Sequence, residues 1–127
     1  MSQSIELISF ELCPFVQRSI ITMLYKNVDH SIKFIDLKNK PDWFLKISPT
    51  GKVPVLKYNN DTVLFESAVI NEFLDEITES SLLPTDPLEK ARARAFIEFS
   101  STLIMRQYMM TMGNEQKKYE KRIWLPL

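Results

Sequence analysis

The sequence has 127 residues, of which 45% are hydrophobic, and its 16 Lys and Arg balance its 16 Asp and Glu. This composition supports a packed core, and the balanced charge argues against a nucleic-acid or anionic-membrane partner. The single cysteine cannot form an internal disulfide, and no apolar run approaches the about 20 residues that span a bilayer. Because the first residues also lack the features of a signal peptide, we expect a soluble, cytoplasmic protein.

The first predicted elements place the only cysteine at the start of a helix. The apolar run from Ile5 to Phe10 predicts a buried strand, and the pattern from Val16 to Tyr25 predicts a helix. Cys13 precedes that helix, and Pro14 fits its first position because the N–H that proline lacks would have no partner there. Unpaired N–H groups at a helix start stabilise a thiolate and can lower its pKa from about 8.5 to roughly 3.5–7.5. We predict a reactive thiol; the alternative is a small buried cysteine that only packs.

A second predicted strand runs from Ser31 to Leu37. Strand, helix and strand within about 33 residues form a unit of βαβ size, whose two strands are parallel. The only histidine, His30, lies in the loop before this strand, and we expect it to be a surface side chain. The helix should bury the side that carries Val16, Ile20, Ile21 and Leu24.

Two lysines, Lys38 and Lys40, precede a short helix that Pro41 can open and that residues 48–51 close. Lysines at this position suggest a patch for an anionic ligand. The alternative is a pair of solvated surface side chains, which is the commoner role of lysine.

The next pattern predicts an antiparallel hairpin. A strand from Lys52 to Tyr58 carries Pro54 near its start, where proline is tolerated and where a cis peptide bond costs little. Turn residues at 59–61 lead into a strand from Thr62 to Phe65.

A helix is predicted to start at residues 66–68, with Ser67 as a capping residue. Its start again offers N–H groups to an anion such as a carboxylate. The buried face should carry Val69, Ile70, Phe73, Leu74 and Ile77. The side that faces water should carry Asn71, Glu72, Asp75 and Glu76.

We expect two domains, residues 1–78 and 87–127, joined by a polar linker at 79–86. Asp86 caps a long helix that has Pro87 at its first position, with Glu89 placed to complete a capping box. The helical pattern continues to Met112, where residues 113–114 form a plausible stop, and residues 116–124 can begin one further helix.

The predicted fold class is α/β: a thioredoxin-like βαβ–ββα domain followed by the start of an all-α domain. At this point the chain resembles the cytosolic glutathione transferases, and within them the omega-like branch that uses cysteine. The resemblance extends from about Ile5 to about Phe99. It is carried by five segments in the family's order, namely Cys13–Phe15, Leu37–Phe44, Pro49–Leu56, Leu64–Ser67 and Leu83–Pro87.

The resemblance implies a role for each matching residue. Cys13 would form a mixed disulfide with glutathione, and Phe15 would line the thiol site. The family's cis proline corresponds to Pro54, which would leave the backbone of Val53 to pair with the cysteinyl part of glutathione. The remaining contacts would come from three further residues: Glu66 to the γ-glutamyl amino group, Ser67 to its carboxylate, and Lys40 to the glycyl carboxylate.

The implied activity is glutathione-dependent thiol transfer or dehydroascorbate reduction, with glutathione as co-substrate and no metal. The second substrate would be a small thiol, disulfide or electrophile. Relatives continue into a helical domain of which we expect only the first helix and a short stub here. The resulting uncovered apolar surface predicts a homodimer. The alternatives are a non-catalytic interaction or regulatory module and a plain monothiol glutaredoxin; the helix predicted at 87–112 argues against the glutaredoxin.

Overall fold

Strands and helices alternate through the first part of the chain, and one long helix follows them. The computed structural model describes residues 3–112, with side chains for residues 3–110. The elements are β1 (Ile5–Ser9), α1 (Pro14–Tyr25), β2 (Ser31–Phe34), α2 (Asp42–Ile47), β3 (Val55–Tyr58), β4 (Thr62–Phe65), α3 (Ser67–Glu76) and α4 (Pro87–Met112).

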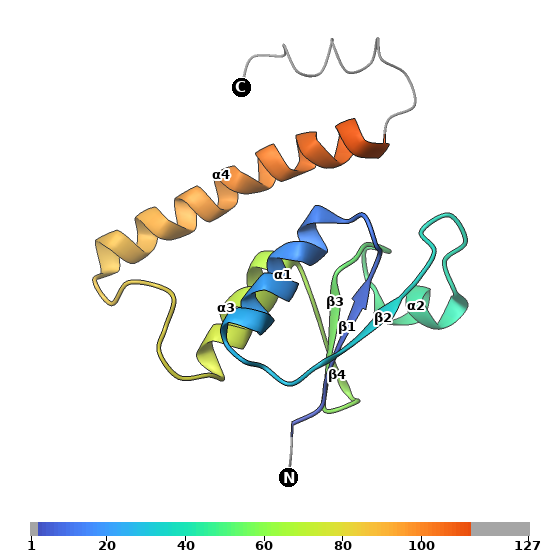
Figure 1. Ribbon diagram of the computed structural model, residues 1–127, viewed down its shortest axis with the longest axis horizontal. Helices are drawn as coiled ribbons and strands as arrows, with labels where there is room; N and C mark the ends of the chain where they lie inside the picture. Colours follow the sequence, from blue (N-terminus) through green and yellow to red (C-terminus); the bar gives the residue numbers. More distant parts are fainter. Residues whose placement is uncertain (1–2, 113–127) are drawn as a thin grey trace. The chain divides into compact units, whose positions relative to one another are not determined.

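The four strands form one mixed sheet in the order β2-β1-β3-β4 (Figure 1). β1 pairs with β2 in parallel, from Glu6 opposite Ser31 to Ser9 opposite Phe34. β3 is antiparallel to both β1 and β4. The predicted βαβ unit and hairpin are therefore confirmed, and the domain is the thioredoxin-like fold that was expected.

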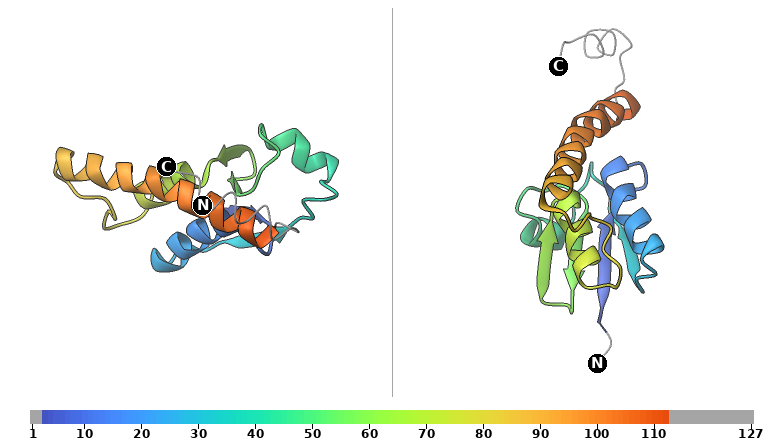
Figure 2. Two further views of the ribbon diagram at one scale, coloured as in Figure 1. Left: turned by 90° about the horizontal axis from the view of Figure 1, so that it is seen from above. Right: turned by 90° about the vertical axis from the view of Figure 1, so that its left-hand side faces the viewer.

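The core lies between the sheet and its helices. α1 and α3 pack against each other, and α2 lies apart from both (Figures 1 and 2). β1, in the middle of the sheet, is buried along most of its length, as its apolar sequence predicts. The core residues are Ile5, Leu7, Ile8, Cys13, Val16, Met23, Ile35, Phe44, Val53, Val55, Leu56, Ile70 and Leu74.

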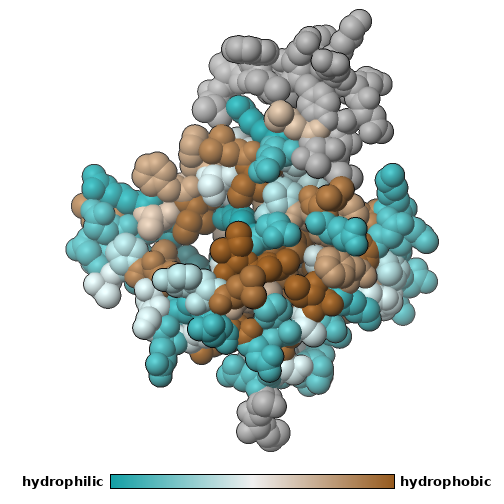
Figure 3. Space-filling model, in the orientation of Figure 1, coloured by the Kyte–Doolittle hydropathy of each residue, from teal (hydrophilic) through white to brown (hydrophobic). Residues whose placement is uncertain are grey.

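The buried face of α1 differs from the prediction. Ile21 and Leu24 are each 63% exposed, whereas Ser19 and Thr22 are buried. The buried residues of α1, which packs against α3, are two apolar ones, Val16 and Met23, and two polar ones, Ser19 and Thr22. The exposed apolar residues of α1 contribute to the hydrophobic patch that Figure 3 shows where α1 lies in that view.

α3 also departs from the predicted pattern. Ser67 is its first helical residue rather than its cap, because Glu66 occupies the N-cap position. Val69 is 55% exposed, although it was predicted to be buried. Asp75 was predicted to face water but is buried, because Lys26 at the end of α1 pairs with it.

Two predicted strands are shorter than expected. β2 ends at Phe34, where its register with β1 ends, and not at Leu37. β3 begins at Val55, because residues 52–54 precede the ladder and contain the bend at Pro54.

The chain divides into two compact units, with the boundary between Leu82 and Leu83. The second unit contains α4, and the N–H of Glu89 donates to the carboxylate of Asp86 at 3.0 Å, which confirms the predicted cap. Within the described residues, no helix is both long enough and apolar enough to cross a bilayer. The predicted stop at 113–114 and the predicted helix at 116–124 lie outside the residues that the structure describes.

Candidate thiol and glutathione site

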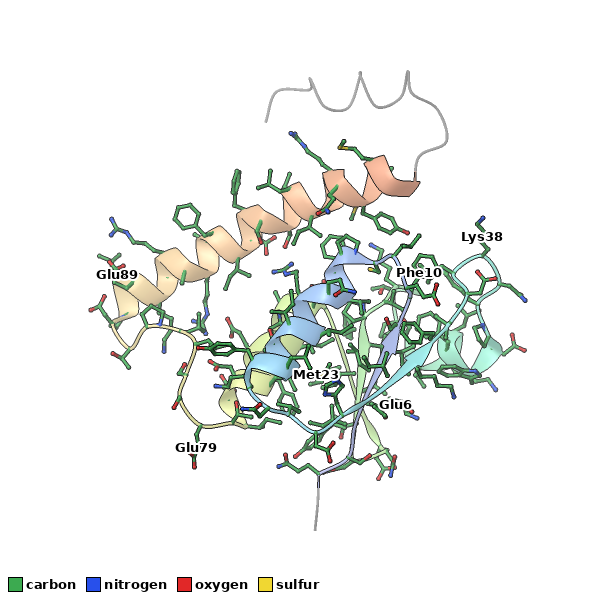
Figure 4. All side chains as sticks on the ribbon, in the orientation of Figure 1. Glu6, Phe10, Met23, Lys38, Glu79 and Glu89 are labelled. Carbon is green, nitrogen blue, oxygen red and sulfur yellow. The ribbon has the colours of Figure 1, made fainter. Side chains whose placement is uncertain are left out.

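Four connections of the first unit meet at one end of the sheet, which we call the site end. β1, β2 and β4 run in the same direction and β3 runs opposite to them, so three strands finish and one starts at this end. Figure 4 shows Phe10, after β1, and Lys38, after β2, towards this end, with Glu6 farther back along β1. The connections carry the residues singled out from the sequence: Cys13, Lys40, Val53, Pro54, Glu66 and Ser67.

Cys13 occupies the N-cap position of α1, with Pro14 at the first helical position, as predicted. Its backbone is extended (φ −86°, ψ 113°), and its N–H donates to the carbonyl of Phe10 at 3.2 Å. The first turn of the helix thereby starts directly at the thiol. Phe15, in the same turn, is partly buried against the core.

The predicted lowering of the Cys13 pKa is wrong for this structure. The residue is only 3% exposed and belongs to the hydrophobic core. Burial raises the pKa of the thiol above its ordinary value, although the N–H groups of Val16 and Phe15 act in the opposite direction. The N–H groups at the helix start lower the pKa of the thiol as expected, but the removal of the thiol from solvent raises this pKa by more.

Val53 and Pro54 lie directly before β3, and the peptide bond between them is cis, as expected. Because the registers of β3 with β1 and β4 both begin at Val55, the backbone of Val53 lies outside the paired part of the sheet. That position suits an added extended peptide, which would bind through main-chain hydrogen bonds.

Lys40 lies against the segment that leads to Val53. Its Nζ is 3.5 Å from the position that a Cβ on Gly51 would occupy. Gly51 has φ +64°, a left-handed conformation that favours glycine, so a larger residue here would be strained as well as close to the ammonium group. The sequence suggests that Lys40 belongs to an anion-binding patch, but it gives no sign that the Lys40 ammonium group lies beside Gly51.

Glu66 and Ser67 join β4 to α3 through an unusual backbone conformation. Glu66 has φ 70° and ψ 113°, a combination that non-glycine residues rarely adopt. Residues held in such conformations cluster at functional sites, where the surrounding structure enforces them. The first helical hydrogen bond runs from the N–H of Ile70 to the carbonyl of Glu66 at 2.9 Å, so the N–H groups before Ile70 form the helix start. Ser67 is buried at that start.

The site end therefore combines a thiol, a lysine, the backbone of Val53 outside the strand ladder, a carboxylate and a helix N-terminus. In the described part of the chain, no three His, Cys, Asp or Glu side chains come together as metal ligands do. The arrangement defines a thioredoxin-like domain with a cysteine at the start of α1 and with Glu66 and Ser67 at the start of α3.

Comparison with known families gives the class a name. The family profile described as "Glutathione S-transferase, N-terminal domain" matches residues 12–77. This match covers more than half of the chain and every residue singled out at the site end. The chain belongs to the glutathione S-transferase family.

Individual relatives place the chain near the omega class. It is 42% identical over 98 residues to glutathione S-transferase omega-1 of Sus scrofa, a match that covers 76% of this chain and 41% of the relative. It is 51% identical over 79 residues to glutathione S-transferase DHAR3, chloroplastic, of Arabidopsis thaliana, which covers 62% of this chain and 30% of the relative. The crystal structure of glutathione transferase Omega 3C from Trametes versicolor superposes with a TM-score of 0.74 at 27% identity, covering 95% of this chain and 56% of that one. The chain thus spans about two-fifths of the length of the omega-1 relatives that it matches.

Proposed function

We propose that this chain binds glutathione at the site end and uses Cys13 for glutathione-dependent thiol transfer. The observation that carries the proposal is the convergence of four separate connections, which bring a thiol, a cation, a carboxylate and a helix start to one end of the sheet. Glutathione has two carboxylates, one ammonium group and a thiol, and this set of groups complements each of them.

The chain's own groups bind the tripeptide from three sides. The carboxylate of Glu66 accepts a hydrogen bond from the γ-glutamyl ammonium group, while the start of α3 at Ser67 binds the neighbouring carboxylate. The backbone of Val53 pairs with the cysteinyl residue as an added strand would, and Lys40 neutralises the glycyl carboxylate. This orientation directs the sulfur of glutathione towards Cys13, beside Phe15.

The transfer then proceeds in two exchanges. The thiolate of Cys13 attacks the glutathione sulfur of a mixed disulfide; the bond between Cys13 and glutathione forms, and the substrate leaves as a thiolate that takes up a proton. A second glutathione, as thiolate, attacks this new bond and releases oxidised glutathione and free Cys13. The substrate leaves as a thiol, and the one added glutathione thiol joins the glutathione of the mixed disulfide as oxidised glutathione, so no second cysteine is required.

Mass spectrometry tests this proposal directly. Incubation with oxidised glutathione should add one glutathionyl group to the wild-type chain, and reduced glutathione should remove it. The Cys13→Ala variant should gain none. Glu66→Ala keeps the thiol but loses a binding group, so it should form the adduct more slowly. An adduct that forms equally fast in wild type and Glu66→Ala would contradict a specific glutathione site.

A second candidate function is a glutathione-binding module without catalysis. The burial of Cys13, which raises its pKa, favours this alternative. Retention on a glutathione matrix together with no detectable adduct at Cys13 would support the module over the enzyme. Loss of both retention and adduct would contradict both functions.

A homodimer in the cytoplasm completes the proposal. α4 carries large apolar side chains that are exposed to solvent, among them Phe96 at 72% and Leu103 at 50%. Such surfaces favour association with a second copy. Sedimentation analysis should therefore give twice the mass of one chain, and a single chain at all concentrations would contradict this part of the proposal.

A further inference from the structure

A buried ion pair lies at the end of the first unit opposite the site end. Nζ of Lys26, the residue that caps the C-terminus of α1, is 2.8 Å from Oδ1 of Asp75 in α3. The two side chains are 3% and 7% exposed. Lysine and aspartate are rarely so buried unless both are fully hydrogen-bonded.

The lysine also holds the segment that follows α3. Its ammonium group donates to the carbonyls of Glu79 at 2.8 Å and Ser80 at 2.6 Å. With the bond to Asp75, all three donors of the ammonium group are used. The backbone of Ser80 has φ 64°, a left-handed conformation that turns the chain before Ser81.

The aspartate holds the same segment from the other side. Its carboxylate accepts hydrogen bonds from the hydroxyl of Ser81 at 2.9 Å and from the N–H of Leu82 at 2.8 and 3.0 Å. The four consecutive residues 79–82 are therefore hydrogen-bonded to one ion pair, Lys26 and Asp75, at the ends of α1 and α3. Figure 4 shows Glu79 at this end of the unit, far from Lys38 at the site end.

The last bond of this network coincides with the boundary between the two compact units, which falls directly after Leu82. α4 begins at Pro87, and the N–H of Glu89 in its first turn donates to the carboxylate of Asp86. The connection between the network and α4 is thus residues 83–86, which can span at most about 13–14 Å. Released residues 79–82 would double this connection to about 26–29 Å.

We propose that Lys26 and Asp75 form a latch that confines the hinge between the two units to residues 83–86. The latch fixes the point at which the chain leaves the first unit, so it limits how far α4 can move relative to that unit. Replacing Lys26 removes three bonds at once, including those to Glu79 and Ser80. It also leaves Asp75 buried without its counter-charge, which weakens the hold of Asp75 on residues 81–82, while the sheet and its core residues stay intact.

Hydrogen exchange and proteolysis test the latch on the full chain. Lys26→Met keeps an unbranched side chain, shorter by one atom, but none of the hydrogen-bond donors. We expect exchange at the N–H of Leu82, and cleavage after Glu79 by a glutamate-specific protease, to rise at least about tenfold. Exchange in β1 and β3 should stay within about twofold of wild type.

Two further variants keep the test decisive. Lys57→Met removes a lysine from a partly exposed pair, 3.6 Å from Glu6, and should change neither readout. Ser81→Ala removes one bond to Asp75 and should raise exchange at Leu82 by a smaller factor, even if Lys26→Met does not fold. Unchanged exchange at Leu82 in both latch variants would overturn the proposal. An equal rise throughout the sheet would also overturn it, since the pair would then support the whole fold rather than this segment.

Discussion

Replacing Glu66 by glycine separates the backbone of the site from its charge. Glu66 holds φ at 70° and ψ at 113°, and a non-glycine residue in such a conformation costs about 1–3 kcal/mol. Glycine adopts positive φ without this cost but gives the unfolded chain more freedom, which offsets about 0.5–1 kcal/mol. The Glu66→Gly variant should therefore be more stable than wild type by about 1 kcal/mol, or about 4–8 °C in Tm.

The same variant should bind glutathione poorly. Loss of a hydrogen bond between charged groups costs about 1.5–3 kcal/mol, which raises the Kd for glutathione about 10- to 150-fold. Glu66→Ala is the matched control: it loses the same carboxylate but keeps a Cβ at the strained position. Its stability should stay within about 0.5 kcal/mol of wild type, because Glu66 is exposed, and its Kd should rise as much as that of Glu66→Gly.

Urea unfolding followed by circular dichroism gives the stabilities, and calorimetric titration with glutathione gives the Kd values. The two variants should differ in unfolding but not in binding. Equal stability of the glycine and alanine variants would refute the strain at Glu66. Wild-type affinity in both variants would refute the role of the carboxylate.

Three further predictions concern burial and charge. Because its pKa is raised, Cys13 should react with iodoacetamide more slowly than a cysteine peptide at pH 7, with a rate that still rises above the usual thiol pKa of about 8.5; a faster reaction would contradict the buried thiol. Hydrogen bonds from Lys26, Leu82 and Ser81 outweigh burial and hold the pKa of Asp75 below its usual value, so its stabilising effect is present above about pH 3.9 and is lost as pH falls through the lower folded pKa. In Asp75→Asn, the free energy of unfolding should therefore lack the fall at low pH that the protonation of Asp75 causes in wild type. Identical pH dependence of stability in Asp75→Asn and wild type would contradict this role of Asp75. Phe44 is fully buried, so Phe44→Ala should lower the free energy of unfolding by about 3–5 kcal/mol in urea titration, and a loss under about 1 kcal/mol would contradict its place in the core.

The sequence predicts the order and type of the elements because these depend on local patterns. The apolar run of β1, the proline at the start of α1 and the turn between β3 and β4 each act within a few residues. Parallel pairing of β1 and β2 follows from the size of the unit that joins them. These local signals also bring the site residues to one end of the sheet, since strand direction fixes where each connection lies.

Contacts between distant parts of the chain could not be predicted in this way. Asp75 resembles a surface residue in the pattern of α3, and its burial depends on Lys26, 49 positions earlier. Ile21 continues the apolar pattern of α1, yet it is exposed, whereas the polar Ser19 and Thr22 of the same helix are buried. The backbone conformation of Glu66 has no local signal, because glutamate is not a residue that favours positive φ.

Cys13 shows how a correct local inference can give the wrong net effect. The helix start lowers the pKa of the thiol as predicted. Burial, which depends on the whole fold, raises this pKa by more than the helix start lowers it. A raised pKa reduces the thiolate fraction tenfold per unit at neutral pH. It also makes the thiolate more nucleophilic, by about 2.5- to 3-fold per unit for a Brønsted coefficient of about 0.4–0.5. The raised pKa of Cys13 therefore slows the proposed exchange by only about 3- to 4-fold per unit. The rate of adduct formation should accordingly rise with pH until the folded pKa is passed.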